Sequence, residues 1–247
     1  MSSSANNVRR PLHETVVDSL GGRIARCEIA VGSRMKVEDL ASEYGVSRTV
    51  MREALRELQS LGMIDSKRSV GSTVQPIGDW SLFHPSVIGW RIDAENVSAQ
   101  LNALTELRQA IEPTAAAFAA QRRSNAQATS IVELAKKLEE AGLDDDIAAF
   151  VNHDVAFHRT ILAASDNELF SSLADSITAA LRGRERHGLL PTPQVRSFEL
   201  HRHVAEAIFR RDSATAEAAM RESLDDVVVE LGQLSPRVYG TSPARRR

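Results

Sequence analysis

The sequence contains a single cysteine, Cys27, so a disulfide bond within the chain is excluded. A lone thiol is typical of proteins from a reducing compartment. No stretch approaches the roughly 18 consecutive apolar residues of a transmembrane helix. The first residues, MSSSANNVRRP, also lack the apolar core of a signal peptide. We therefore expect a soluble cytoplasmic protein that does not enter a membrane.

Aromatic residues and net charge are also scarce. Phe, Trp and Tyr make up 4% of the 247 residues, whereas alanine, leucine, glutamate and arginine are abundant, which favours helices. The formal net charge is only −3, so any basic surface must be local. Residues 1–78 carry 11 Lys and Arg against 9 Asp and Glu, a balance of +2, which leaves −5 for the remainder. The N-terminal part therefore has the sign of charge that DNA binding requires.

Residues 11–76 contain the pattern of a winged helix-turn-helix domain. Apolar residues recur at helical spacing in its first part, and VEDLASEY (37–44) predicts a short helix that the next glycine ends. Ser47 is expected to cap a third helix over about 48–61. The following MIDSKRSVGSTVQP predicts two short strands around a turn. Three helices and a hairpin in this order predict that DNA-binding fold.

The third of these helices carries Arg48, Arg52 and Arg56 at intervals of four residues. This spacing puts the three side chains on one helical face, although like charges at this spacing repel one another. Such a face is either an ordinary solvated surface, balanced by Glu53 and Glu57, or a surface directed at DNA. The helix-turn-helix pattern, the cap and the basic hairpin around it favour DNA.

In a helix-turn-helix, the N-terminal end of the second helix lies nearest the base edges. Arg48 and Arg52 occupy that end, and a guanidinium group pairs bidentately with guanine or phosphate. Basic residues of the hairpin would reach the DNA backbone or the minor groove. We therefore expect DNA contacts from six residues of this helix and hairpin: Arg48, Thr49, Arg52, Lys67, Arg68 and Gly71.

The rest of the chain predicts an all-α domain, so the predicted fold class is mainly α. Residues 77–96, which include both tryptophans, are expected to form a linker that packs rather than dangles. Residues 97–234 predict a bundle of about six helices with short connections. Residues 1–10 and 235–247 are polar and are expected to be disordered. The predicted helices are about 97–122, 125–141, 145–165, 167–187, 195–211 and 213–233.

The stretch GVSRTVMREALRELQSLGMIDSKRSVGSTV strongly resembles the GntR family of bacterial transcription regulators. The second half resembles the FadR-type ligand-sensing domain of that family, through ELRQAIEPTAAAFAAQR, DVAFHRTILAASDNELF and HRHVAEAIFRRDSATAEAAM. The resemblance implies a homodimer on a palindromic operator in double-stranded DNA, usually a repressor, released by a small carboxylate effector. It assigns DNA contacts to Arg48, Arg52 and Gly71. Glu38 stands where the family often has arginine, so the operator sequence does not carry over.

Three residues of the second half form a candidate metal site. Asp154 and His158 are four residues apart on one predicted helix, and His201 lies near the start of a later one. A carboxylate and two imidazoles suit a divalent metal such as Zn, Ni or Mn, whereas the alternative is a hydrogen-bonded structural contact. In the family, a further histidine completes the set, and that position falls at Ser223. We expect a three-ligand site completed by water and effector. His203 points elsewhere on its helix.

Arginines are expected to bind the anionic effector beside this site. The family points an arginine of the first bundle helix into the pocket, and that position is Arg108. A buried arginine needs an anion, which is either Glu112, four residues later, or the carboxylate of the effector. Arg182 is a further candidate. The predicted effector-binding residues are Arg108, Asp154, His158, Arg182 and His201.

Serine at the last ligand position, with PSVIGWRID, most resembles the sugar-acid branch of the family, such as repressors of galactonate or gluconate operons. A regulator that responds to another small organic acid is the nearest alternative. A metal-dependent enzyme built on Asp154, His158 and His201, and an all-α interaction scaffold, are alternatives from other classes. The sequence contains no nucleophile motif or phosphate-binding loop that would support an enzyme.

Overall fold

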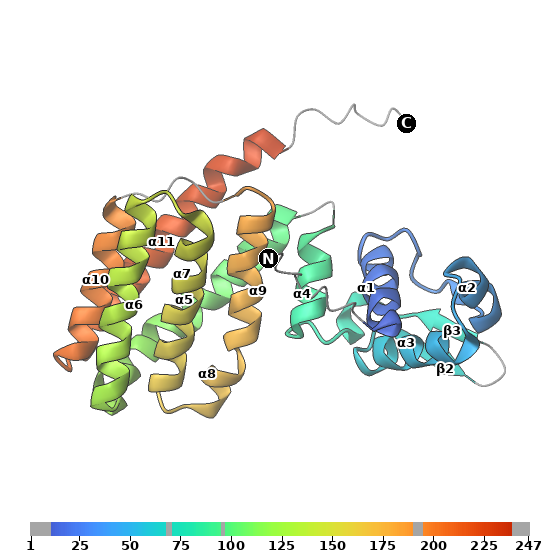
Figure 1. Cartoon of the computed structure of the whole chain (residues 1–247), viewed down its shortest axis with the longest axis horizontal. Coiled ribbons are helices and arrows are strands. Elements are labelled where there is room, and N and C mark those ends of the chain that lie inside the picture. Colours follow the sequence, from blue (N-terminus) through green and yellow to red (C-terminus); the bar gives the residue numbers. More distant parts are fainter. Residues whose placement is uncertain (1–10, 68–70, 95–96, 190–194, 239–247) are drawn as a thin grey trace, which may run out of the picture. The chain divides into compact units, whose positions relative to one another are not determined.

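The computed structural model of the chain divides into two compact units, residues 1–95 and 96–247 (Figure 1). None of the helices in the described part is both long and apolar enough to cross a membrane. Arg68 and the two polar termini, 1–10 and 239–247, lie outside the residues that the structure describes. The described residues are 11–67, 71–94, 97–189 and 195–238, without the side chains of Lys67 and of 233–238.

The N-terminal unit contains the predicted helix-turn-helix. Apolar positions spaced for one face give α2 and α3, and Gly45, with a φ of +63°, ends the first of them and turns the chain towards the second. The predicted order of three helices and a hairpin is confirmed in this unit. Its elements are α1 (Leu12–Ala25), β1 (Arg34–Met35), α2 (Val37–Glu43), α3 (Arg48–Ser60), β2 (Ile64–Lys67), β3 (Gly71–Val74), the 3-10 helix η1 (Ile77–Asp79) and α4 (Pro85–Ile92).

The hairpin belongs to a three-stranded antiparallel sheet of order β1-β3-β2, one strand more than the sequence predicts. The extra strand is β1, which pairs Arg34 with Thr73 and Met35 with Ser72. Gly71 makes this pairing feasible because its φ is +87°, and a Cβ there would lie 2.7 Å from the carbonyl oxygen of Met35. The glycine of the wing is therefore required by the sheet itself.

Residues 77–92 pack on the apolar core of the N-terminal unit. Trp80, Val87 and Trp90 are buried in the same cluster as Leu20 of α1 and the buried face of α3. The indole of Trp80 donates a hydrogen bond to the carbonyl oxygen of Gln75, at 2.9 Å. The Trp90 ring lies so close to α1 that a Cβ at Gly21 would be 2.6 Å from it. Helix α4 is therefore part of the first unit's core.

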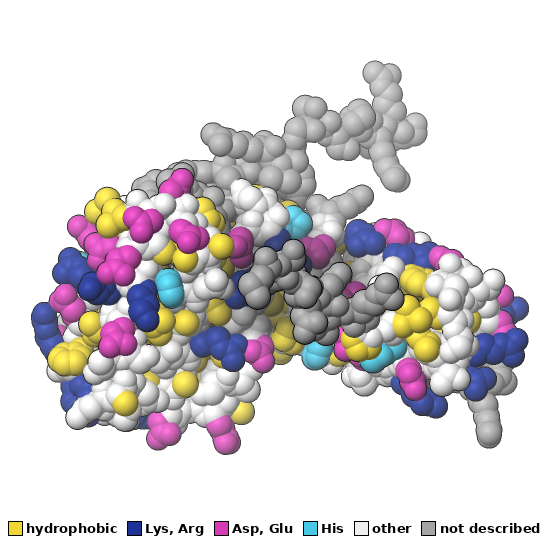
Figure 2. All heavy atoms as spheres, in the orientation of Figure 1, with side chains coloured by type: hydrophobic (Ala, Val, Ile, Leu, Met, Phe, Trp, Pro, Cys, Tyr) yellow, Lys and Arg dark blue, Asp and Glu magenta, His cyan; other side chains and the backbone are white. Residues whose placement is uncertain are grey.

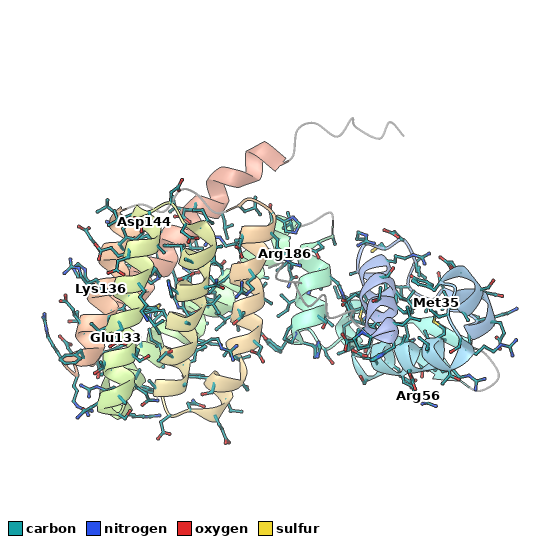
Figure 3. All side chains as sticks on the ribbon, viewed as in Figure 1. Met35, Arg56, Glu133, Lys136, Asp144 and Arg186 are labelled. Carbon is teal, nitrogen blue, oxygen red and sulfur yellow. The ribbon has the colours of Figure 1, made fainter. Side chains whose placement is uncertain are left out.

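The C-terminal unit is all-α in its described residues, as the sequence predicts. Helix α5 packs against α7 and α11, and α10 packs against α6 and α11, around a core rich in alanine (Figure 1). The polar side of α6, with Glu133 and Lys136, points away from the bundle (Figure 3). The helices are α5 (Val97–Arg122), α6 (Asn125–Leu143), α7 (Ile147–Ala164), α8 (Glu168–Ser172), α9 (Ala174–Arg186), α10 (Val195–Phe209) and α11 (Ser213–Val238).

The described part of this unit holds seven helices because the helix predicted over 167–187 is interrupted at Leu173. Before the break, Ser171 donates its hydroxyl to the carbonyls of Leu162 and Asn167, and Ser172 donates to that of Leu169. Serine hydroxyls that bond to nearby carbonyls compete with the regular helical pattern. At the other end of the unit, α11 continues four residues past residue 234, to Val238.

Candidate functional site

The exposed face of α3 carries the arginines singled out in the sequence. Ser47 caps the helix, since its hydroxyl accepts a hydrogen bond from the backbone N–H of Val50 at 3.2 Å. The opposite face is buried through a stripe of four residues: Met51, Ala54, Leu55 and Leu58. Because the stripe fixes the helix's rotation, Arg48, Thr49, Arg52 and Arg56 face outward, and Figure 3 shows Arg56 on the outer side of α3.

The arginines of α3 are not neutralised by glutamates of the same helix. Within the described residues, neither Glu53 nor Glu57 forms an ion pair with Arg52 or Arg56. Arg48 has one long contact, with its Nη1 atom 3.8 Å from Oε1 of Glu38 on α2, and 69% of its side chain is exposed. Figure 2 shows basic side chains along the edge of the N-terminal unit where α2 and α3 lie. The face is therefore available to an anionic partner.

The wing contributes less to the described surface. Gly71 opens β3, and the backbone of Lys67 ends β2, opposite it in the register. Arg68 lies outside the described residues. The predicted contacts of the wing with DNA therefore remain predictions, whereas the close approach at Gly71 already has a structural cause in the β1 carbonyl.

In the C-terminal unit, the structure brings together Asp154, His158 and His201. Helix α7 supplies the first two on one face, and α10 brings the third alongside. The Nε2 atoms of His158 and His201 lie 3.3 Å and 3.1 Å from the same carboxylate oxygen of Asp154. One ligand atom from each residue fits within a group less than 4.8 Å across. Both imidazoles are buried.

The donor set fits a divalent metal because the other nitrogen of each ring faces a different oxygen. Nδ1 of His158 lies 2.5 Å from Oε2 of Glu112, and Nδ1 of His201 lies 2.7 Å from the carbonyl oxygen of Ser197. Nε2 of both rings is therefore left to face Asp154, and the hydrogen bond to Ser197 orients the His201 ring, as the outer shell of metal sites commonly does. Two imidazole nitrogens and a carboxylate oxygen would thus hold a metal such as zinc.

Arg108 extends this cluster and has an internal anion. Its Nε donates to Oε1 of Glu112 at 2.6 Å, and both side chains are almost fully buried. Its Nη2 also lies 3.1 Å from Nε2 of His158. Of the two anions considered from the sequence, Glu112 is the one that the structure pairs with Arg108. The charge of this arginine is therefore matched before any ligand is bound.

The charges of the cluster shift its pKa values strongly. Burial lowers the pKa of His158, but the negative charges of Glu112 and Asp154 outweigh it and raise this pKa from 6.5 to about 9. Burial raises the pKa of Glu112, but Arg108 and His158 outweigh it and lower this pKa from 4.5 to about 2. Burial also opposes ionisation of Asp154, yet His158 and His201 hold its pKa well below the usual value. Metal binding must therefore displace a proton from His158.

These shifts predict a pH dependence of stability for the metal-free protein. Because the pKa of His158 is raised, its contribution is complete below pH 6.5 and is lost as the pH rises through about 9. The free energy of unfolding, measured with chelator present, should fall by up to about 3 kcal/mol over that range. The loss should persist in His203→Gln, an exposed control, and disappear in His158→Gln. A flat profile for the unsubstituted protein over this range would contradict the prediction.

The arginines of α9 are arranged differently from the prediction. Arg182 is exposed and donates to Oδ1 of Asn152 at 2.8 Å, so the structure does not bring it to the cluster. Arg184, two residues later, is buried and donates to Glu230 of α11. Helical spacing could have identified it, since Arg184 continues the buried stripe of Ile177 and Leu181, from which Arg182 departs.

Two sequence families together account for most of the chain. The pattern described as "Bacterial regulatory proteins, gntR family" matches residues 12–74, and that of the FCD domain matches residues 103–226. The chain belongs to the GntR family. Its second unit is an FCD domain, which is the FadR-type sensing domain that the sequence resembles. The predicted family and fold class are thereby confirmed.

Similar GntR proteins are named as regulators. The chain is 30% identical over 240 residues to the HTH-type transcriptional repressor NanR of Citrobacter rodentium, covering 93% of this chain and 90% of that one. It is 26% identical over 210 residues to the galactonate operon transcriptional repressor of Escherichia coli, covering 83% and 90%. Among solved structures, Lar, which controls expression of the Listeria monocytogenes agr system, shares the fold with a TM-score of 0.63 at 15% identity, over 92% of this chain and all of that one.

Membership of the GntR family decides between the classes of function considered. The chain is a transcription regulator with an effector-binding FCD domain, and the similar proteins are regulators rather than enzymes. The interpretation of the Asp154, His158 and His201 cluster as an enzyme active site is therefore rejected. Ser223, which the resemblance places at the fourth-ligand position, is half-buried on α11.

Proposed function

We propose that this GntR protein is a repressor that binds a palindromic operator as a homodimer and is released by a small carboxylate. The observation that carries DNA recognition is the outward row of arginines on α3, in which Arg52 and Arg56 have no ion pair among the described residues. In a dimer, two copies of α3 would enter successive major grooves, about 34 Å apart. Because its target is chromosomal DNA, the protein is proposed to act in the cytoplasm.

We propose that the effector binds in the C-terminal unit beside Asp154, His158 and His201, and that it is a sugar acid. A hydroxylated acid offers carboxylate and hydroxyl oxygens, which an incomplete three-ligand metal site can accept. The similar galactonate operon repressor supports this class. The similar protein of Escherichia coli named a putative L-lactate dehydrogenase operon regulatory protein, 29% identical over 238 residues, makes a smaller hydroxy acid the second candidate.

Release from DNA requires the effector to bind the DNA-incompetent state more tightly, since equal affinity for both states shifts nothing. Trp80, Val87 and Trp90 are buried in the first unit's core, so the chain passes from one unit to the other between Ile92 and Val97. We propose that the effector acts on the DNA-binding unit through this short connection.

The proposal is tested by DNA capture followed by ligand release. The full-length protein, purified and loaded with Zn²⁺, is used to select fragments from genomic DNA at low salt, where phosphate contacts are strongest. The selected fragments should contain an inverted repeat and bind two chains each. D-galactonate, D-gluconate or L-lactate should then lower the affinity at least about tenfold. Selection of no fragment, or fragments bound by one chain, would refute the repressor model.

Metal binding is predicted to depend on the three proposed ligands. Zn²⁺ titrated against a chromophoric chelator should bind one ion per chain, and Asp154→Ala or His158→Ala should weaken binding by more than about 100-fold. His203→Ala, two residues from His201 but exposed, should bind as the unsubstituted protein does. Equal losses in all three variants would show that the cluster is not the site.

A further inference from the structure

Among the described residues, the C-terminal unit buries three arginines: Arg108, Arg123 and Arg184. Arg123 has an acceptor for each of its three nitrogens, whereas the other two are bound differently. Arg108 uses its Nε on Glu112, a carboxylate that is itself almost fully buried. Within the part of the chain that the structure describes, Arg184 is bound only through Nη2, which donates to Oε2 of Glu230 at 2.7 Å. Its Nε is buried, since only 7% of the side chain is exposed, and it has no hydrogen-bond acceptor among the described residues. Arg184 is therefore the buried arginine with an unused donor.

A guanidinium group donates through a planar edge. Nε–H and one Nη–H are parallel, so they bind the two oxygens of a carboxylate together. Buried N–H groups in native proteins nearly always have an acceptor, so an exception requires a reason. A ligand carboxylate would supply the missing acceptor. The present partner, Glu230, is one-third exposed and holds one nitrogen only, so it can be exchanged at a lower cost than Glu112.

Arg184 also lies beside the proposed effector site. Burial lowers the pKa of Arg184. The charge of Arg108, on α5, lowers this pKa further, and the charge of Asp154, on α7, raises it. Helix α9, which carries Arg184, packs against both of these helices. The unused donor and the candidate metal ligands therefore share one region of the same unit.

We propose that Arg184 binds the carboxylate of the effector through its Nε edge, in exchange for Glu230. The inference rests on the proposed function, which supplies the acid, and it assigns the carboxylate to Arg184 rather than to Arg108 or Arg182. Glu230 is then a resident competitor for the same guanidinium group, and the effector is a carboxylic acid rather than a neutral sugar.

The test uses calorimetric titration of zinc-loaded full-length protein with D-galactonate, D-gluconate, L-lactate and, as the neutral analogue, D-galactose. Arg184→Gln should weaken acid binding at least about tenfold. Arg184→Lys should weaken it similarly, because an ammonium group keeps the charge but has no planar edge. Glu230→Gln should bind the acid severalfold more tightly. Arg182→Gln, on the exposed side of the same helix, should be unchanged.

The glutamate variant separates ligand binding from a structural role. If Arg184 acted only by pairing with Glu230, Arg184→Gln and Glu230→Gln would weaken binding alike, and the inference would be overturned. Unchanged acid affinity in Arg184→Gln would overturn it too, while leaving the proposed function intact. If the unsubstituted protein bound none of the acids, the proposed effector would fail and this inference with it. Should Arg184→Gln not fold, Arg184→Lys and Glu230→Gln decide between the same outcomes.

Discussion

Replacing Arg108 with alanine is expected to lower the free energy of unfolding of the C-terminal unit by about 3–5 kcal/mol. Both Arg108 and Glu112 are almost fully buried, so the variant leaves a carboxylate in the interior without the arginine that lowers its pKa to about 2. His158 remains beside the Glu112 carboxylate, but it also forms an ion pair with Asp154. Urea unfolding at pH 7 with chelator present, followed by far-ultraviolet circular dichroism, measures the loss.

An exposed ion pair on the same unit is the matched control. Arg202 and Glu206 are also four residues apart and 3.2 Å from each other, but about half of the arginine is exposed. Arg202→Ala should therefore cost no more than about 0.5 kcal/mol. Replacing both buried partners, with Arg108→Met and Glu112→Leu, should cost less than Arg108→Ala alone, because no charge is stranded. A loss for Arg108→Ala no larger than that of the exposed control would contradict the buried pairing.

Replacing Arg52 with alanine is expected to weaken operator binding by about 5- to 150-fold, the effect of one bidentate contact of about 1–3 kcal/mol. The side chain is exposed and has no ion pair among the described residues, so the melting temperature should not change. Fluorescence anisotropy with a selected operator fragment, repeated at several salt concentrations, measures the affinity. If Arg52 contacts a phosphate instead, the loss should be uniform across sequences and the salt dependence should decrease by about one ion.

Gln59, exposed near the other end of α3, offers the control for this experiment. Gln59→Ala should retain operator affinity, since that end of a recognition helix lies farther from the base edges. Should Arg52→Ala bind the operator as tightly as Gln59→Ala, the arginine row would be an ordinary solvated face after all.

The helices of the fold follow from local patterns, but two of its features do not. The stripe from Met51 to Leu58 and the cap at Ser47 predict α3 almost to the residue. Strand β1 has only two residues, and its partner is nearly forty positions away, so no periodicity indicates it. The break at Leu173 depends on serine hydroxyls that reach backbone carbonyls, one of them on α7. Helical periodicity does not predict contacts between segments that are distant in the sequence.

The candidate site divides in the same way. Asp154 and His158 share a face because of their spacing within α7, and that part is predictable. The distance from Asp154 to His201, and the use of Glu112 by both Arg108 and His158, depend on how α5, α7 and α10 pack. Which arginine of α9 is buried was partly predictable, since the buried stripe of α9 would have favoured Arg184 over Arg182.

The contact between Trp90 and Gly21 sets the point at which a sensor can be exchanged between regulators. A fusion joined at residue 76 would replace α4 by a helix from another protein. The side chains of that helix would have to pack against α1 at Gly21, where the Trp90 ring leaves no room for a Cβ. A joint after Ile92 keeps Trp80, Val87 and Trp90 with the core in which they are buried. Chimeras that combine this DNA-binding unit with other sensing domains should therefore keep the α4 of the DNA-binding unit.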